Sequence, residues 1–335
     1  MKVDAPLYSF DAPEPEARRL EAKGYAGGFT FEGPHDPFFP LLLAARATER
    51  IELYTAVAIA FSRNPMILAN IGWDLQQLSK GRFILGLGTQ IKAHIERRFS
   101  MPWSHPAARM REMVLAIQSI WRCWQNKERL EFRGEFYQHT LMTPAFCPSP
   151  TEYGGPRIFL AGVGPRMTEV AGEVADGFFV HPFNTLESLR RLTLPALERG
   201  LERAGRPRSA IEISSQLMIC SGTTDEELER VRLATKGQIA FYGSTPAYRP
   251  VLDVHGWGDL QPTLNRLSKE GKWAEMTSLI RDELLEAIAV CAPMKDVARR
   301  VRERCDGRVD RVSLVGHWTK DPDVWDDVVR DLSAG

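Results

Sequence analysis

The sequence predicts an α/β protein whose parallel strands close into a (β/α)8 TIM barrel with insertions. Eight apolar runs of strand length are nearly continuous, as expected of strands that are buried on both faces. Amphipathic segments lie between these runs, and eight parallel strands are the number that closes a barrel. A doubly wound open sheet is the competing architecture, which this pattern favours less. The runs are VDAPLY (3–8), GGFTFE (27–32), IELYTAVAIA (51–60), RFILGLG (82–88), RIFLAGV (157–163), GFFVHPF (177–183), IEISSQLMIC (211–220) and RVSLVG (311–316).

Two of the intervening helices carry clear start and stop signals. One is expected over 65–79, with Gly81 as its C-terminal stop. The other is expected over 105–124, with Ser104 as its N-cap and Pro106 in its first turn. Its apolar face is either core or a dimer surface. The residues on that face are Met110, Met113, Val114, Ile117, Ile120, Trp121 and Trp124.

Two stretches exceed a minimal barrel, and we expect both to be insertion loops in a single domain over 1–335. Residues 139–156 are rich in proline and turn residues and predict a surface loop. Residues 241–275 combine prolines and glycines with Tyr242, Tyr248 and Trp257, which favours a substrate lid over a plain surface excursion.

The composition narrows the classes of function. The chain has 335 residues, is 44% hydrophobic and has a formal net charge of +0, so it lacks the electrostatic footprint of a protein that binds nucleic acid or an anionic membrane. Its first residues do not read as a signal peptide, and no apolar run is long enough to span a bilayer, so we expect a cytoplasmic protein.

Metal and hydrolase chemistry find no support in the sequence. Five scattered cysteines without a CxxC pair argue against a disulfide framework and a zinc site. No metal-like spacing relates the histidines at positions 105, 139, 255 and 317, so we expect no metal. There is no GxSxG elbow and no GxxxxGK[ST] loop.

Several motifs together point to one family. Residues 51–90 contain a TxV…RxP…A pattern followed by LQQLSKGRFILGLGT, and further matches are FEGPHDPF (31–38), HIERRFSMPWSHPAARMRE (94–112) and AGVGPRMTEVAGEVADG (161–177). This sequence resembles the luciferase-like monooxygenase superfamily from residue 1 to about residue 320, most of all the branch that uses the deazaflavin coenzyme F420. The resemblance implies a (β/α)8 barrel with the cofactor ring at the carboxyl ends of the strands.

A glycine turn between a strand and a helix is the expected site of the cofactor phosphate. Glycines let backbone approach an anion closely, and a helix N-terminus favours negative charge. The resemblance assigns the phosphate to this turn, and an arginine there could add a charge-assisted contact. The turn consists of Gly162, Val163, Gly164, Pro165 and Arg166.

Contacts with the cofactor ring follow from the resemblance. It implies a cis non-proline peptide at Ala56–Val57, behind the ring, and a side-chain contact at His94. Gly88 and Thr89 leave room for a flat ring, and Asp36 is a further expected contact. Some relatives place a carboxylate just after this glycine turn, where the present chain has Gln90, Ile91 and Lys92.

The expected chemistry is proton exchange beside a hydride carrier. His35 is the first candidate for exchanging a proton with the substrate and Glu32 the second. Alternatively, His35 or Asp36 caps the next helix or holds the loop. Phe38, Trp103 and His181 are expected to line the substrate pocket, although core packing competes for Trp103 and a structural role for His181.

Hydride transfer between coenzyme F420 and a small organic substrate is therefore the leading hypothesis, because a deazaflavin favours two-electron chemistry. An FMN-dependent monooxygenase is the alternative, followed by a non-catalytic flavin-binding barrel. The expected partner is a small-molecule substrate, with neither nucleic acid nor membrane, and the resemblance implies a homodimer.

Overall fold

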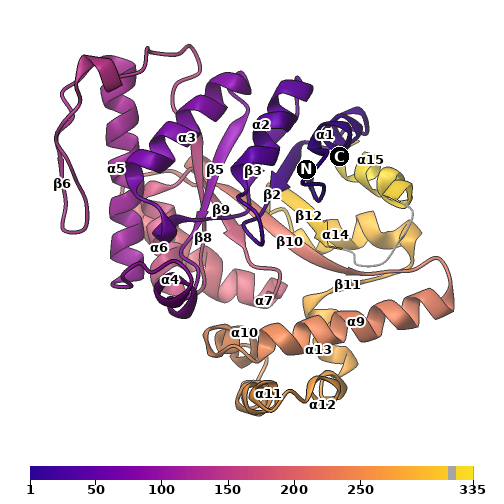
Figure 1. Cartoon of the computed structure of the whole chain (residues 1–335). Helices are drawn as coiled ribbons and strands as arrows, with labels where there is room; N and C mark the ends of the chain where they lie inside the picture. Colours follow the sequence, from indigo (N-terminus) through magenta and orange to yellow (C-terminus); the bar gives the residue numbers. More distant parts are fainter. Residues whose placement is uncertain (316–321, 335) are drawn as a thin grey trace.

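The computed structural model describes residues 1–315 and 322–334, and a closed ring of parallel strands lies at its centre (Figure 1). The ring runs β1-β2-β3-β5-β8-β9-β10-β12 and returns to β1. Its strands are β1 (Lys2–Pro6), β2 (Gly27–Thr30), β3 (Glu52–Thr55), β5 (Phe83–Gly88), β8 (Arg157–Ala161), β9 (Gly177–Val180), β10 (Glu212–Cys220) and β12 (Arg311–Val315).

Closure of this ring confirms the barrel and excludes the open sheet. Lys2 pairs with Arg311 where β1 meets β12, and Glu212 pairs with Gly177 where β10 meets β9. Each of the eight apolar runs coincides with one barrel strand, although β1 begins one residue before its run. The last residue of the run 311–316 lies outside the described residues. Two short strands, β4 (Ala58–Ile59) and β11 (Val290–Cys291), extend the sheet beside β5 and β10.

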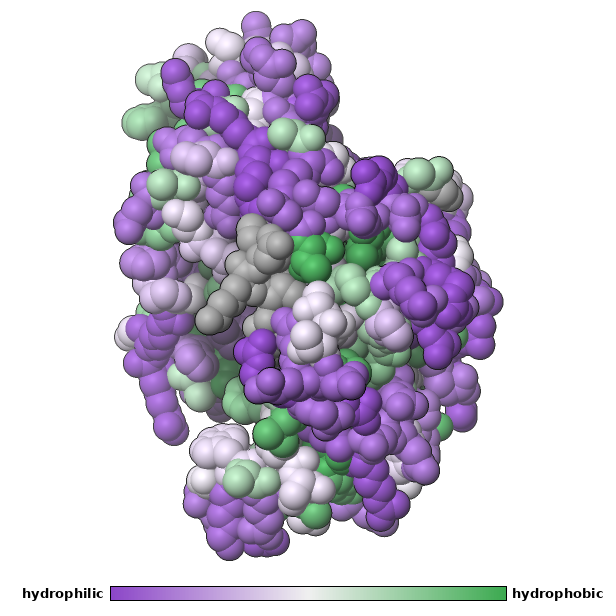
Figure 2. All heavy atoms as spheres, turned by 90° about the vertical axis from the view of Figure 1, so that its right-hand side faces the viewer, coloured by the Kyte–Doolittle hydropathy of each residue, from purple (hydrophilic) through white to green (hydrophobic). Residues whose placement is uncertain are grey.

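Helices surround the barrel. They are α1 (Pro13–Ala22), α2 (Phe38–Ala47), α3 (Pro65–Leu78), α5 (Pro106–Asn126), α6 (Pro165–Val174), α8 (Leu194–Arg203), α14 (Val297–Cys305) and α15 (Asp326–Ala334), with the short α4 (Lys92–Arg97) and α7 (Leu186–Ser188). Their inward faces belong to one large hydrophobic cluster. Their outward faces are mostly polar, although α2 and α3 expose Phe39, Leu43 and Ile67. The face shown in Figure 2 is mainly hydrophilic, with small apolar areas near its middle.

The two helices with clear sequence signals form largely as expected. The Asn64 side chain caps α3 by accepting a hydrogen bond from Ile67 N, and Gly81 follows the helix with φ +84°. For α5 the expected Ser104 cap is wrong, because His105, in the left-handed region with φ +39°, directly precedes Pro106 and makes no side-chain cap. The apolar face of α5 is buried core within this chain, so it gives no argument for the homodimer, which stays a prediction.

A neutral ionic cluster fills the amino-terminal end of the barrel. The fully buried Arg311 contacts both carboxylate oxygens of Asp4, at 2.6 and 2.8 Å, and lies 3.0 Å from Glu52. Burial alone would lower the pKa of Arg311, but Asp4 and the neighbouring acidic groups raise it above its ordinary value. The cluster comprises the cations Lys2, Arg157 and Arg311 and the carboxylates Asp4, Glu52 and Glu212.

A layer of aromatic and aliphatic side chains separates this cluster from the other end of the barrel. Tyr54 joins the two, since its hydroxyl donates to Asp4 at 2.8 Å while its ring stacks on Phe29 and Phe179. This buried hydrophobic layer therefore separates the carboxyl end of the barrel from the ionic cluster at the amino-terminal end. The layer consists of Phe29, Tyr54, Ile84, Phe159 and Phe179.

The two insertions differ in character. Residues 139–156 start at the last residue of a hairpin of β6 (Phe132–Arg133) and β7 (Gln138–His139). They are mostly irregular and, apart from the buried Pro156, at least partly exposed. Residues 241–275, expected to be a loop, are largely helical. Their prolines stand in the first turns of helices and Gly256 and Gly271 lie just beyond helix ends, so these residues delimit helices and do not mark a loop.

The helices over residues 225–288, which we call the helical insertion, lie on one side of the barrel in Figure 1 and have their own hydrophobic cluster. They are α9 (Asp225–Gly243), α10 (Arg249–Asp253), α11 (Leu260–Lys269), α12 (Trp273–Ser278) and α13 (Asp282–Ile288). The cluster includes Leu252, Leu264, Leu267 and Met276, which are almost fully buried. Trp257 packs against this cluster and stacks on His255, so it is not a wall of the cavity described below.

Candidate active site

A cavity of about 1180 Å³ opens at the carboxyl ends of the barrel strands. In (β/α)8 barrels this end carries the active site, because the loops after the strands converge there. Residues following several strands line the cavity, together with the start of α5 and the first part of the helical insertion. Of the expected site residues, those in its lining are Glu32, Ala56, Val57, Gly88, Thr89, Trp103, Gly162, Val163, Gly164, Pro165, Arg166 and His181.

Part of the cavity wall is formed by tightly packed backbone at the ends of β3 and β5, which we call the floor. The peptide bond between Ala56 and Val57 is cis, as the resemblance implied. A Cβ placed on Gly88 would lie 2.6 Å from Val57 Cγ2, and one on Gly86 would lie 1.7 Å from the Thr55 carbonyl oxygen. Only glycine fits at these two positions, which explains the glycines of the FILGLG strand.

The glycine turn after β8 presents backbone and one cation to the same cavity. Gly164 precedes α6 with φ +88°, and a Cβ there would meet no atom within 4 Å, so its exposed face is open. The first N–H groups of a helix have no partner inside the helix, and they favour an anion. Arg166 is exposed and has no ion-pair partner among the described residues.

Glu32 lies in the cavity wall as one member of a charged group. Its carboxylate accepts hydrogen bonds from Ile59 N at 2.7 Å and from Arg63 at 2.6 Å. The other guanidinium nitrogen of Arg63 contacts Asp36 at 2.8 Å. Asp36 also accepts from Phe38 N at 2.9 Å, so it holds the start of α2 and does not line the cavity, as the alternative interpretation proposed. In the sequence, Arg63 was recognised only as the arginine of the RxP motif, and no role in the site was predicted for it.

Three further expected residues are also absent from the lining. His35 is exposed and stacks on Phe10 at 4.0 Å, because the loop after β2 packs on the loop after β1. His94 is exposed on α4. Phe38 is buried in the main core with the Arg63 guanidinium over its ring, so it is a core residue and not a pocket wall.

Aromatic side chains line two parts of the cavity wall. One part is at Trp103, before α5, and the other is at Tyr242 and Tyr248 in the helical insertion. Trp103 lines the cavity and packs edge-on against Phe61, so its wall and core interpretations both hold. His181, just after β9, stacks on Tyr248 at 4.5 Å and meets Tyr242 edge-on at 4.8 Å. Burial lowers the pKa of His181 to about 4. Gln216 also lines the cavity, although it was not among the predicted site residues. The sequence feature that could have identified it is a polar residue inside the apolar run 211–220.

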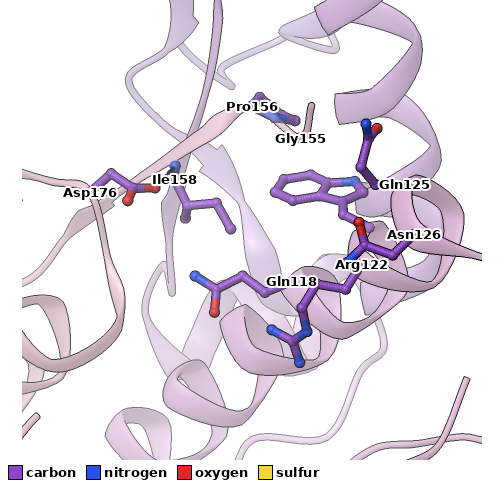
Figure 3. A pocket seen from close by; sticks show the side chains of 9 residues that line it. Gln118, Arg122, Gln125, Asn126, Gly155, Pro156, Ile158 and Asp176 are labelled. Carbon is purple, nitrogen blue, oxygen red and sulfur yellow. Dashed lines mark hydrogen bonds between the residues drawn. The ribbon is translucent and has the colours of Figure 1, made fainter. Parts of the chain in front are cut away.

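A second cavity, of about 310 Å³, lies against α5 near the amino ends of β8 and β9 (Figure 3). Trp121, Arg122 and Gln118 contribute to its wall. It contains neither a glycine turn at a helix start nor strand carboxyl ends, so it is not the candidate active site. Within residues 1–315 and 322–334 no cluster of three or more His, Cys, Asp or Glu side chains could hold a metal, and no helix is long and apolar enough to cross a membrane.

Comparison with known proteins decides the family. The sequence model of the luciferase-like monooxygenase family matches residues 11–311. The chain belongs to this family. An uncharacterised member from Mycobacterium tuberculosis is 58% identical over 293 residues, which cover 88% of this chain and 86% of that protein.

The names of two similar proteins include a cofactor. A relative from Nocardia farcinica, an F420-dependent glucose-6-phosphate dehydrogenase, is 30% identical over 204 residues, covering 59% of this chain and 58% of that protein. The coenzyme F420-dependent tetrahydromethanopterin reductase from Methanopyrus kandleri has the same fold, with a TM-score of 0.77, 21% identity and coverage of 99% and 96% of the two chains.

The cavity fits the flavin-type cofactors of the luciferase-like family. Small-molecule sites commonly measure about 300–1,000 Å³, so this cavity has room for a tricyclic ring and a substrate together. The small residues Ala56 and Gly88 beside Val57 leave room for the ring, and the open face of Gly164 beside Arg166 suits an anionic tail.

Proposed function

We propose that this protein is a coenzyme F420-dependent oxidoreductase that transfers a hydride between the deazaflavin and a small organic substrate. One observation carries the proposal: the Ala56–Val57 floor and the Gly162–Arg166 turn line the same cavity. The F420-dependent relative from Nocardia farcinica supports the deazaflavin. When bound, the deazaflavin would supply hydride chemistry, which leaves binding, orientation and protonation to the protein.

Each group of cavity residues has a proposed role. The Gly162–Arg166 turn holds the phosphate, and Ala56, Val57, Gly88 and Thr89 contact the ring. Tyr242 and Tyr248 cover the mouth from the helical insertion and help to exclude water. Of the two candidates for proton exchange, Glu32 is the one that lines the cavity, with its side chain largely buried beside Arg63.

Titration with the two candidate cofactors tests the proposal. The protein should quench the fluorescence of coenzyme F420 with micromolar or better affinity, and FMN should bind at least tenfold more weakly. Micromolar affinity for FMN with no binding of the deazaflavin would reject the proposal.

An FMN-dependent monooxygenase is the second candidate, favoured by the name of the matching family. In that case the protein would bind reduced FMN, which supplies two electrons, and one oxygen atom of dioxygen would enter the substrate while the other leaves as water. Incorporation of oxygen-18 from labelled dioxygen into a product, tested with reduced FMN and a panel of organic substrates, separates the two candidates.

A further inference from the structure

His181 and Tyr248 form a hydrogen-bonded pair in the wall of the cavity. His181 follows β9, and Tyr248 ends the short helix η5 (Pro246–Tyr248) of the insertion. The distance from His181 Nε2 to Tyr248 Oη is 3.0 Å, and the two rings stack with an interplanar angle of 26°. Tyr242 packs edge-on against the histidine ring, so the pair is held in one orientation.

The backbone determines which nitrogen of His181 carries the proton. Phe183 N donates a hydrogen bond to His181 Nδ1 at 3.0 Å. A neutral imidazole has one donor and one acceptor nitrogen. Because Nδ1 is the acceptor, the proton lies on Nε2, which donates to the oxygen of Tyr248.

This arrangement leaves the hydroxyl proton of Tyr248 unused. Burial and then the proximity of Tyr242 raise the pKa of Tyr248 to about 12, so the phenol stays protonated. No described residue other than His181 forms a hydrogen bond with Tyr248 Oη, and Tyr248 lines the cavity. Its O–H group is therefore a donor that is available to a molecule in the cavity.

We propose that Tyr248, oriented by His181, donates a hydrogen bond to an oxygen atom of the substrate. Tyr248 is then a specificity-determining residue and His181 a positioning residue. The substrate class that they select is an organic molecule with an accessible carbonyl or hydroxyl oxygen, since an analogue without it would leave a partly buried donor unpaired. The inference rests on the proposed function, because it names the substrate class of the same site.

A matched pair of ring compounds tests this inference. Cyclohexanone and methylenecyclohexane have similar shapes, but only the former has an oxygen acceptor. NMR titrations of the protein, with and without bound coenzyme F420, should show that the wild type binds cyclohexanone roughly three- to tenfold more tightly, as one net hydrogen bond implies.

Three variants assign the preference to the pair. Tyr248→Phe keeps the ring and should abolish the preference, whereas the control Tyr153→Phe, which lies outside the cavity lining, should keep it. His181→Asn retains an acceptor near the position of Nδ1 for Phe183 N but lacks the Nε2 donor. It should reduce the preference and leave the fold intact, as checked by circular dichroism. Nitrogen-15 chemical shifts of the wild-type imidazole should place the proton on Nε2.

Several results would overturn the inference. They are equal or undetectable binding of both probes by the wild type, a preference that survives in Tyr248→Phe, and a proton on Nδ1. Weaker binding of coenzyme F420 by Tyr248→Phe, without a change in the preference, would show that the hydroxyl serves the cofactor instead. A wild type that keeps the preference but binds no coenzyme F420 would reject the proposed function and leave the Tyr248 donor standing.

Discussion

Single residues at the barrel mouth carry most of the proposed chemistry. Gly164 leaves an open face beside the first turn of α6, and the exposed Arg166 has no carboxylate partner among the described residues. An unpaired arginine next to free backbone N–H groups is suited to a phosphate. His181, by contrast, is held neutral by burial.

Arg166→Ala should weaken binding of coenzyme F420 about tenfold or more, because a hydrogen bond to a charged group is worth about 1.5–3 kcal/mol. The loss should shrink as ionic strength rises, since salt screens exposed charges. Fluorescence titration at two salt concentrations measures both effects. The matched control is Arg122→Ala, an exposed arginine at the second cavity, which should bind the cofactor like the wild type.

The lowered pKa of His181 makes a prediction about stability. Between pH 4 and 6.5 the unfolded chain binds a proton at this position that the folded chain does not bind, so stability falls as the pH drops through this range and is constant above it. His181→Asn should remove this part of the dependence. Urea denaturation at pH 7 and pH 4.5 checks it, and an unchanged pH dependence in the variant would contradict it. His139 and His255 also have lowered pKa values, but both remain in the variant.

At the scale of elements, the helical insertion forms one wall of the cavity and is held together by its own hydrophobic cluster. Tyr242 is the penultimate residue of α9 and Tyr248 directly precedes α10, so the packing of these helices determines where the two tyrosines lie. The integrity of this cluster therefore bears on the site as well as on stability.

Leu267→Ala should lower the free energy of unfolding by about 2–5 kcal/mol, because it leaves a cavity at a fully buried position on α11. Leu233→Ala is the control on neighbouring α9, where the side chain is 64% exposed, and it should cost less than about 0.5 kcal/mol. Chemical denaturation compares the two variants. Equal stability losses would show that the cluster is not packed as described.

Sequence reasoning located the elements better than the site. Strands buried on both faces leave continuous apolar runs, so every barrel strand was identifiable. The direction of a loop depends instead on tertiary contacts, such as the stacking of His35 on Phe10, which has no local pattern. The pairing of His181 with Tyr248 joins residues 67 positions apart and was equally hidden, although the sequence placed both near the mouth.

At the scale of the whole molecule, the barrel is closed at one end by charges and open at the other for ligands. The ionic cluster takes residues from β1, β3, β8, β10 and β12, so it ties the first strand to the last. Buried charges are costly unless they are paired. Closure of the ring is therefore most sensitive to the fully buried Arg311 and Asp4, and less so to the partly exposed Lys2 and Arg157.

Arg311→Met should destabilise the protein by about 3–5 kcal/mol, because Asp4 would keep a buried charge without its main partner. The double variant Arg311→Met with Asp4→Asn removes that charge and should recover part of the loss. Denaturation curves of the wild type and both variants provide the comparison. A single variant as stable as the wild type would mean that the cluster does not hold the ring closed.

The most direct test of the account is a crystal structure of the protein with coenzyme F420. We expect the deazaflavin ring on the Ala56–Val57 floor, next to Gly88, and the phosphate at the Gly162–Arg166 turn. A ring bound elsewhere, for example against Trp121 in the second cavity, or a phosphate directed away from that turn would contradict the account.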